Sequence, residues 1–231
     1  MKNIWLPVFV LVALVHLAGV FLEHKFLVFS TKPFLMPLLA MWLAMGTHGH
    51  PPHFLKKMVF AGLAFATLGD VLLLFGEKPL FFILGLVAFL FTHLSYIGGF
   101  SAISNLDKGF LRERPTWGLL FVVYAVGLTG WLWPGIPEAM KVPVAIYAAV
   151  ITSMAMSVFN LKRSISNKLF QTLFAGALLF VLSDSLIAVS RFGDAFTSPG
   201  WVIMATYLAG QFLIVKGVRD FLLLRSGDSN T

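Results

Sequence analysis

Long apolar segments alternate with short polar connections along the whole chain. A transmembrane helix needs roughly 20 mostly apolar residues, and eight segments approach or exceed that length. The second of them is short, and the last is longer than one span. The segments cover residues 4–21, 33–46, 54–75, 80–103, 117–133, 142–159, 169–190 and 200–224. This pattern predicts an all-α, polytopic membrane protein, a bundle of about eight transmembrane helices.

The connections between these segments are short and contain the Gly, Pro and charged residues that are typical of turns. None is long enough for a soluble domain, so residues 1–231 are expected to form a single integral membrane domain. Lys2 precedes an apolar stretch, as in a signal peptide, but no clear small-residue cleavage site follows. We therefore expect the first segment to be retained as a span.

Composition narrows the class of protein further. The chain is 58% hydrophobic and 12% charged, whereas soluble domains average about 25% charged residues. It contains no Cys, which excludes thiol catalysis, thiolate metal sites and disulfides. The net charge of +7 is carried by basic residues between apolar segments, so it predicts membrane orientation and no nucleic-acid partner.

The positions of Lys and Arg predict which side of the membrane each connection faces. With a cytoplasmic N-terminus, eleven of the 17 Lys and Arg residues fall on the cytoplasmic side. Five fall on the opposite side: Lys25, Lys32, Lys78, Lys141 and Arg191. Because positive residues accumulate in cytoplasmic connections, we expect both termini in the cytoplasm, with a bacterial inner membrane as the location.

The chain resembles itself at an offset of 114 residues. This register aligns Asp70 with Asp184 and places His93 opposite Tyr207. Other aligned pairs are Ala61 with Ala175, Gly62 with Gly176, Leu68 with Leu182, Leu72 with Leu186, Thr92 with Thr206 and Leu94 with Leu208. Four spans separate the copies, so the halves 1–114 and 115–231 are predicted to form a parallel 4+4 repeat. The alternative is chance similarity among apolar helices.

Two aspartates lie inside predicted spans, where a charged side chain costs roughly 3 kcal/mol and marks a candidate functional site. Asp70 comes six residues before Gly76, and Asp184 comes seven residues before Arg191. At 1.5 Å per residue, each lies about 10 Å inside its helix end. In the predicted orientation, both lie in the outer half of the membrane. The alternative is that each only bonds to a neighbouring helix.

Other polar residues within or beside the spans are candidates for the same site. His93 and Tyr96 share a helical face, as do Tyr207 and Gln211. Lys32 precedes Pro33 and is expected at the outer end of the second span, where it either binds a phosphate or extends to the membrane surface. Each of the others has packing as its alternative role. Tyr124 and Tyr147 fit no pattern in the sequence.

A histidine-rich segment, 47–53, contains His48, His50 and His53. Its spacing matches no helical or knuckle-type zinc site, so we interpret it as a solvated connection. The chain also lacks the Gly-x-Ser-x-Gly elbow, the Walker loop, the dinucleotide fingerprint and the His-Glu-x-x-His motif. An esterase with a serine nucleophile is therefore unsupported.

Taken together, these residues resemble the YhhN-like membrane family, whose animal members are lysoplasmalogenases. The resemblance covers most of the chain. It rests on Thr31-Lys32-Pro33, Gly69-Asp70-Val71-Leu72-Leu73, His93-Leu94-Ser95-Tyr96, Gly176-Ala177-Leu178-Leu179-Phe180, Ser183-Asp184-Ser185-Leu186, and Tyr207 with Gln211. It implies a bundle of about eight spans that hydrolyses the vinyl ether bond of lysoplasmalogens to a fatty aldehyde and a glycerophospho-headgroup.

This reaction suits two buried carboxyl groups. Acid-catalysed cleavage of a vinyl ether starts with protonation of its β-carbon, so the enzyme needs one protonated acid and a nearby base. We expect Asp70 and Asp184 to be this catalytic pair, with either one as the acid. His93, Tyr96, Tyr207 and Gln211 would orient the water and the carboxyl groups, and Lys32 would bind the phosphate. No metal or cofactor is required, and the expected partners are a lysophospholipid and membrane lipids.

Two other functions remain open at this point. Parallel repeats and paired aspartates also suit a proton-coupled transporter of lipids or small molecules. A metal-dependent lipid hydrolase would use Asp70, His93 and Asp184 as zinc ligands. Transport in liposomes would distinguish the first alternative, and metal analysis would distinguish the second.

Overall fold

The structure, a computed structural model, describes residues 4–50, 52–104, 109–193 and 199–227. Within these ranges the chain forms α-helices and short 3-10 turns, with no β-strand. The helices are α1 (Trp5–Phe21), α2 (Lys25–Gly46), α3 (Phe54–Leu73), α4 (Pro79–Ile103), α5 (Phe110–Glu113), α6 (Thr116–Leu132), α7 (Glu138–Phe159), α8 (Asn167–Phe192) and α9 (Gly200–Gly227). The all-α fold class is confirmed, and each predicted span corresponds to one long helix.

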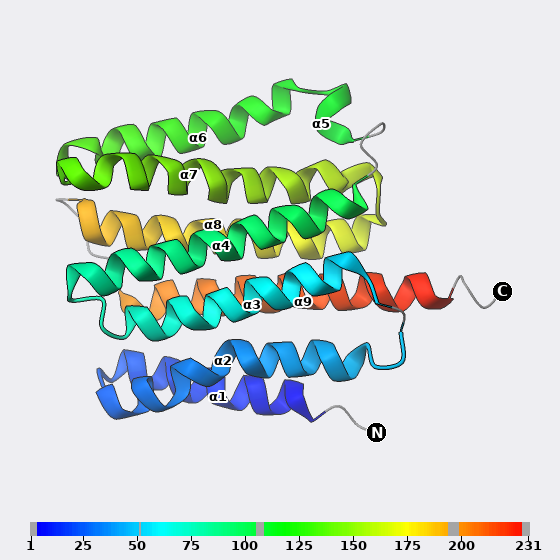
Figure 1. The fold of residues 1–231 in the computed structure, drawn as a ribbon, viewed down its shortest axis with the longest axis horizontal. Coiled ribbons are helices and arrows are strands. Elements are labelled where there is room, and N and C mark those ends of the chain that lie inside the picture. The colour runs from blue at the N-terminus through cyan, green and yellow to red at the C-terminus, as the bar shows by residue number, and fades with distance from the viewer. Residues whose placement is uncertain (1–3, 51, 105–108, 194–198, 228–231) are drawn as a thin grey trace. The chain divides into compact units, whose positions relative to one another are not determined.

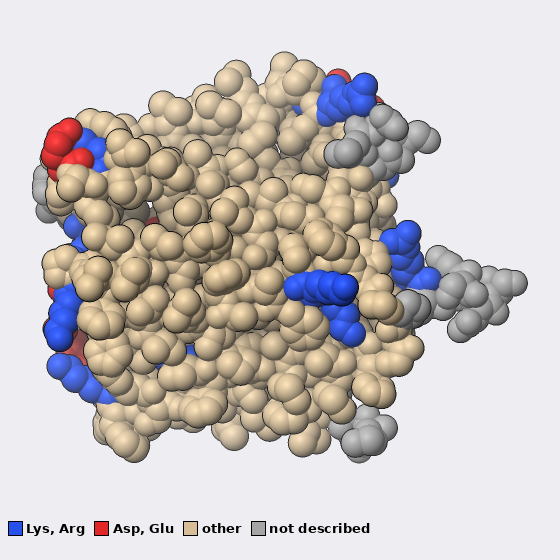
Figure 2. Space-filling model, in the orientation of Figure 1, with Lys and Arg blue, Asp and Glu red and all other residues tan. Residues whose placement is uncertain are grey.

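Six of these helices are long and apolar enough to cross a membrane: α2, α4, α6, α7, α8 and α9. Helix α1 is apolar but has 17 residues. Helix α3 has 20 residues and carries Lys56, Lys57 and Asp70. On the face drawn in Figure 2, charged side chains lie mostly near helix ends and the surface between them is uncharged. This is the distribution expected of an integral membrane protein.

The second span is longer than the sequence predicted. It begins at Lys25 rather than at residue 33, because the His24 side chain caps the helix by accepting a hydrogen bond from the Leu27 backbone. The helix then continues through Pro33 and Pro37. Membrane helices tolerate internal proline, since neighbouring groups satisfy the freed backbone carbonyls. Proline was therefore misleading as a signal for the start of this helix.

The chain divides into two compact units, which are described separately. The first unit contains residues 1–99 and 214–231. In it, α1 and α2 form an antiparallel pair joined by a short connection (Figure 1), and α2 packs on α3. The end of this connection is closed by backbone hydrogen bonds from Leu22 and His24 to carbonyls of α1.

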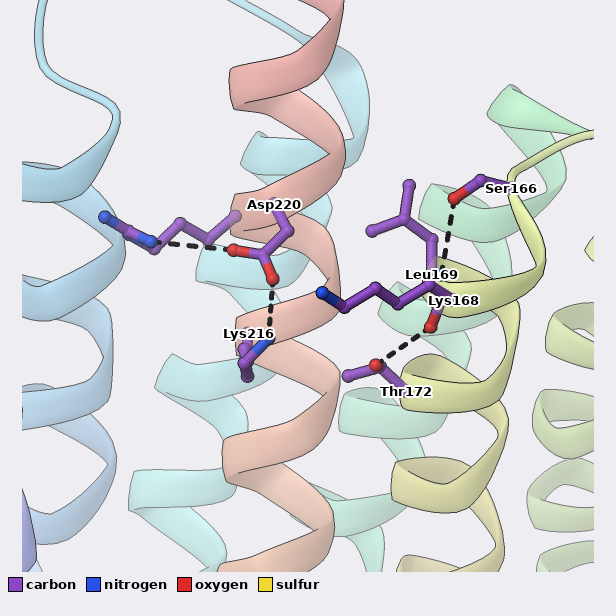
Figure 3. A network of polar contacts seen from close by, with 7 residues as sticks. Ser166, Lys168, Leu169, Thr172, Lys216 and Asp220 are labelled. Atoms are coloured by element: carbon purple, nitrogen blue, oxygen red, sulfur yellow. Dashed lines mark hydrogen bonds and ion pairs between the residues drawn. The ribbon is translucent and has the colours of Figure 1, made fainter.

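The second unit contains residues 100–213. Here α6 packs on α7, and α7 packs on α8 (Figure 1). Ser166 caps the start of α8 by accepting from the Leu169 backbone (Figure 3). Buried aromatic rings gather where α6 begins and α7 ends, with Phe159 5.3 Å from Phe110 and 5.2 Å from Phe174 between ring centroids. These aromatic contacts hold α6, α7 and α8 together at this end.

Candidate active site

Asp70 lies in the last turn of α3 and forms a buried ion pair with Lys32 of α2. The Asp70 side chain is 2% exposed and that of Lys32 is 12% exposed, with Lys32 Nζ 3.8 Å from Asp70 Oδ1. A carboxylate is disfavoured at a helix C-terminus because the helix dipole is negative there. The ammonium group of Lys32 offsets both this effect and the removal of the carboxylate from water.

This pairing changes the position expected for Lys32. The sequence placed it at the outer end of the second span, but it lies inside α2, seven residues after Lys25. The expected position was wrong because the helix starts earlier than Pro33. Instead of extending to the membrane surface, the side chain reaches across to the carboxyl group of Asp70.

A second buried polar contact lies beside this ion pair. His16 of α1 is fully buried, and its Nδ1 is 2.8 Å from the Thr31 hydroxyl oxygen. Thr31 directly precedes Lys32 and also donates to the Leu27 carbonyl. His16 Nε2 is buried with no hydrogen-bond partner among the described residues. His16 was not predicted from the sequence, although an ionisable side chain within an apolar span is itself a signal of function.

In the second unit, Asp184 of α8 accepts a short hydrogen bond from the Tyr147 hydroxyl of α7. One residue further on, the Ser185 hydroxyl lies 2.6 Å from that of Tyr124 in α6. Neither tyrosine fits a pattern in the sequence, so the sequence predicts no role for them. The repeat gives a signal for Tyr147, because the position 114 residues after Lys32 is 146, one residue before Tyr147. Each aspartate therefore has a polar partner from the preceding long helix.

Helix packing around the two aspartates follows the same 114-residue offset. A Cβ atom at Gly69 would collide with the Phe89 ring in the first unit. In the second unit, Ser183 corresponds to Gly69 and Ile203 corresponds to Phe89. The Ser183 hydroxyl donates to the Ile203 carbonyl at 3.0 Å. Further along, a Cβ at Gly62 would collide with the Tyr96 ring.

The contact corresponding to Gly62 and Tyr96 joins Gly176 to Gly210, where a Cβ on Gly210 would lie 3.0 Å from the Gly176 carbonyl oxygen. Two contacts between consecutive helices thus recur at the same offset. They support the predicted repeat, which remains a prediction for the complete halves.

The other predicted site residues are buried but lie deeper than the aspartates along their helices. His93 and Tyr96 are fully buried in α4, and Tyr207 and Gln211 are 4% and 0% exposed in α9. Because Gly69 faces Phe89, His93 lies about 6 Å beyond the level of Gly69, the residue before Asp70, at 1.5 Å per residue. The Tyr207 ring packs edge-on against Phe180 at 5.4 Å. These residues line the helix interfaces next to the aspartates.

An open, mostly apolar groove, the aromatic groove, lies between α6, α7 and α8. Its volume is about 450 Å³, within the range of roughly 300–1,000 Å³ found for ligand sites. Its lining includes Trp117, Leu120, Tyr124, Phe159, Phe174 and Leu182. From Phe174 to Leu182 it extends about 12 Å along α8, and it ends at Tyr124, which contacts Ser185 beside Asp184. The groove therefore leads to the region of Asp184.

The histidine-rich segment is partly structural. His53 caps α3 by accepting from the Leu55 backbone, and its Nε2 lies 2.9 Å from the Arg225 guanidinium. Burial, together with the positive charge of Arg225, lowers the pKa of His53 from its usual 6.5. Among the described residues, no three His, Asp or Glu side chains are grouped closely enough to hold a metal ion.

A third carboxylate within a helix serves as a useful comparison. Asp220 of α9 accepts from Lys216 Nζ at 2.6 Å and lies 3.5 Å from the Arg219 guanidinium (Figure 3). Its side chain is 31% exposed, so its charge stays partly in contact with solvent. Asp70 differs in its almost complete burial.

Comparison with known proteins connects this architecture to one family. The family model described as the YhhN family matches residues 27–218. The chain is 31% identical over 188 residues to bovine lysoplasmalogenase TMEM86A, covering 78% of this chain and 73% of the relative. A lysoplasmalogenase of Mycobacterium bovis is 27% identical, covering 80% and 69%. An uncharacterized membrane protein YhhN of Escherichia coli is 27% identical, covering 83% and 86%. No solved structure matches.

Proposed function

Because the chain belongs to the YhhN family, we propose that it is a membrane hydrolase that cleaves the vinyl ether bond of lysoplasmalogen-type lysophospholipids. Relatives named lysoplasmalogenase cover most of its length. The observation that carries the proposal is the pair of helix-borne carboxyl groups, Asp70 and Asp184, each held by a polar partner from the preceding long helix. Carboxyl groups retained inside spans are functional candidates by default.

The chemistry requires a group that donates a proton and a group that stabilises the positive charge as it develops on the substrate. A carboxylic acid transfers its proton to the β-carbon of the vinyl ether, which leaves an oxocarbenium ion at the α-carbon. Water adds to that carbon and loses a proton to the second carboxylate, forming a hemiacetal. The hemiacetal then collapses to a fatty aldehyde and the glycerophospho alcohol. Asp70 and Asp184 are proposed as the acid and the base, since this sequence needs one of each.

The partners of the two aspartates suit these roles. Lys32 orients the Asp70 carboxyl group and balances its charge, which replaces the phosphate-binding role expected from the sequence. Tyr147 fixes one oxygen of Asp184 by donating its hydroxyl hydrogen bond to it. His93, Tyr96, Tyr207 and Gln211 are proposed to position water and the neighbouring helices, because all four are buried polar or aromatic groups.

The aromatic groove is proposed to hold the hydrocarbon chain of the substrate. It is lined by aromatic and aliphatic side chains and ends beside the Asp184 region. With both termini in the cytoplasm, as the Lys and Arg distribution favours, the groove extends from that region towards the cytoplasmic side. A lysolipid of the outer leaflet of a bacterial inner membrane would then place its tail in the groove.

Incubation of the purified protein with a lysoplasmalogen in D₂O tests this function. The mechanism predicts a fatty aldehyde with one deuterium on the carbon next to the carbonyl, because that carbon receives the solvent-derived proton. An ester lysophospholipid of the same chain length should release no aldehyde. Failure to release aldehyde from lysoplasmalogen would overturn the proposal.

Matched variants of three aspartates test which carboxyl groups take part in the reaction. Asp70→Asn and Asp184→Asn should each abolish turnover, whereas Asp220→Asn should keep it, because Asp220 pairs with Lys216 outside the proposed site. Undiminished activity in a chelator would argue against the metal-dependent alternative. Substrate movement across liposomes without aldehyde release would instead favour the transporter alternative.

A further inference from the structure

A charged pocket, the terminal pocket, opens in the first unit where α1 ends, α2 begins and α3 ends. Its volume is about 440 Å³, which is sufficient for a small ligand group. Its lining includes Glu23, Lys25, Phe29, Phe75, Glu77 and Lys78. At the left of Figure 2, positive and negative side chains lie together, where Figure 1 places the α1–α2 and α3–α4 connections. The proposed reaction assigns no role to this pocket.

The terminal pocket lies close to the ion pair of Asp70 and Lys32. Leu74 lines the pocket and follows Asp70 by four residues, and its backbone is still helical. Val28 lines the pocket and precedes Lys32 by four residues in α2. Residues four apart share a helix face about 6 Å apart. The pocket therefore lies one helical turn from the proposed catalytic carboxyl group.

The charges that line the pocket are balanced. Two ammonium groups, Lys25 and Lys78, accompany two carboxylates, Glu23 and Glu77. Lysine is a common phosphate ligand, and a carboxylate complements an organic ammonium group. A ligand with one phosphate and one ammonium group matches this lining, whereas a purely anionic ligand would leave both carboxylates facing negative charge.

Aromatic rings add a second feature that suits an organic cation. Phe29 and Phe75 pack edge to face with centroids 5.6 Å apart, and both line the pocket. Each ring is partly exposed, at 41% and 44%. Ring faces attract ammonium and quaternary ammonium groups, so the rings and the glutamates favour the same end of a zwitterionic ligand.

Backbone strain at Glu23 is an independent indication that this side chain has a role. Glu23 is the one described non-glycine residue with positive φ, at 54°. It occupies the left-handed position of the motif that ends α1, where the His24 backbone donates to the Gly19 carbonyl. Glycine is usual there because a Cβ atom is unfavourable. Strain of this kind persists most often at binding and active sites.

We propose that the terminal pocket binds the zwitterionic headgroup of the lysolipid, a phosphate ester carrying an ammonium or quaternary ammonium group. Lys25 and Lys78 contact the phosphate, and Glu23, Glu77 and the two phenylalanine rings contact the cation. The assignment rests on the proposed function for the identity of the lipid. It makes headgroup charge, rather than chain length, the property that this pocket selects.

Binding of non-cleavable lipids by the full-length protein tests the assignment. Ester lysophosphatidylcholine and ester lysophosphatidylglycerol of equal chain length are titrated separately into protein reconstituted in nanodiscs. Wild-type protein should bind the choline lipid more tightly. Glu23→Gln combined with Glu77→Gln should reduce that preference by roughly two- to fivefold per carboxylate, as for exposed ion pairs. Glu138→Gln, which removes an exposed carboxylate paired with Lys141, should leave it unchanged.

Glu23→Gly separates binding from folding. It relieves the positive-φ strain, so its melting temperature should equal or exceed that of wild type while its preference for the choline lipid falls. Equal affinity of wild type for the two lipids would overturn the assignment. So would a choline preference that persists in the double variant. Because the assay needs no turnover, its outcome is separate from the aldehyde-release test of the proposed function.

Discussion

Lys32 Nζ lies 3.8 Å from Asp70 Oδ1, and both side chains are largely removed from solvent. Breaking a buried pair by removing one partner is far more costly than removing both. The pair also determines the charge next to the proposed reaction, because the ammonium group keeps a negative carboxylate tolerable inside a membrane helix bundle. In the proposed mechanism, Lys32 is thus both a structural and a functional residue.

Lys32→Met should destabilise the protein by about 3 kcal/mol, because Asp70 loses its counter-charge in a buried environment. Thermal unfolding in detergent measures this effect. Adding Asp70→Asn to Lys32→Met should restore much of the stability without restoring aldehyde release. A double variant that is less stable than Lys32→Met would contradict the ion pair.

Tyr147→Phe should lower kcat roughly tenfold or more, because it removes the hydrogen bond that holds a proposed catalytic carboxyl group in place, and a small misplacement of such a group can cost up to about 10²-fold. Tyr124→Phe is the matched control: it removes a contact to Ser185 and should cost less than about fivefold. Equal losses of kcat in the two variants would show that the hydrogen bond from Tyr147 to Asp184 has no specific role in the reaction.

Leu120→Trp should shift substrate preference towards shorter hydrocarbon chains, because the larger side chain fills part of the aromatic groove. Aldehyde release from a series of chain lengths measures the shift. The neighbouring Leu119 is equally exposed, at 61% against 60%, and is not part of the groove lining. Leu119→Trp should therefore keep the wild-type optimum, and a shift in both variants would point to a general effect of bulk.

His53 predicts a stability change in mildly acidic solution. Its folded-state pKa lies below the usual 6.5, so the unfolded chain binds the proton more readily and stability falls as pH decreases from about 6.5. Melting temperature measured at pH 7.5 and pH 5.5 reports the change. In His53→Gln, the part of the change due to this residue should disappear; an unaltered pH dependence would assign it to other groups.

Much of the fold follows from the sequence because the apolar segments are long and their connections are short. The exception was the start of α2, where Pro33 suggested a boundary and the true signal was the capping side chain of His24. Side-chain capping depends on a single residue within a polar stretch, so hydropathy does not reveal it. Proline inside a span is similarly ambiguous.

The candidate site was predicted in part. Asp70 and Asp184 were identified from their cost in a membrane, and Lys32 was included for a different role. Tyr147 was missed because a tyrosine in an apolar helix is usual and only the aspartate across the helix interface gives it significance. His16 was missed because its segment was considered only as a signal peptide or a retained span, and its polar side chain was given no weight. Partners from other helices depend on packing, which residue patterns within one segment do not specify.

The central claim is that Asp70 and Asp184 serve one reaction on one bound lipid. The most direct measurement is the rate of aldehyde release by Asp70→Asn, Asp184→Asn and the double variant, each confirmed as folded by its melting temperature. The account predicts a loss of roughly 10²–10⁴-fold in each single variant, and little further loss in the double variant because the two groups act as a unit. A near-normal rate in either single variant, or losses that multiply in the double variant, would contradict it.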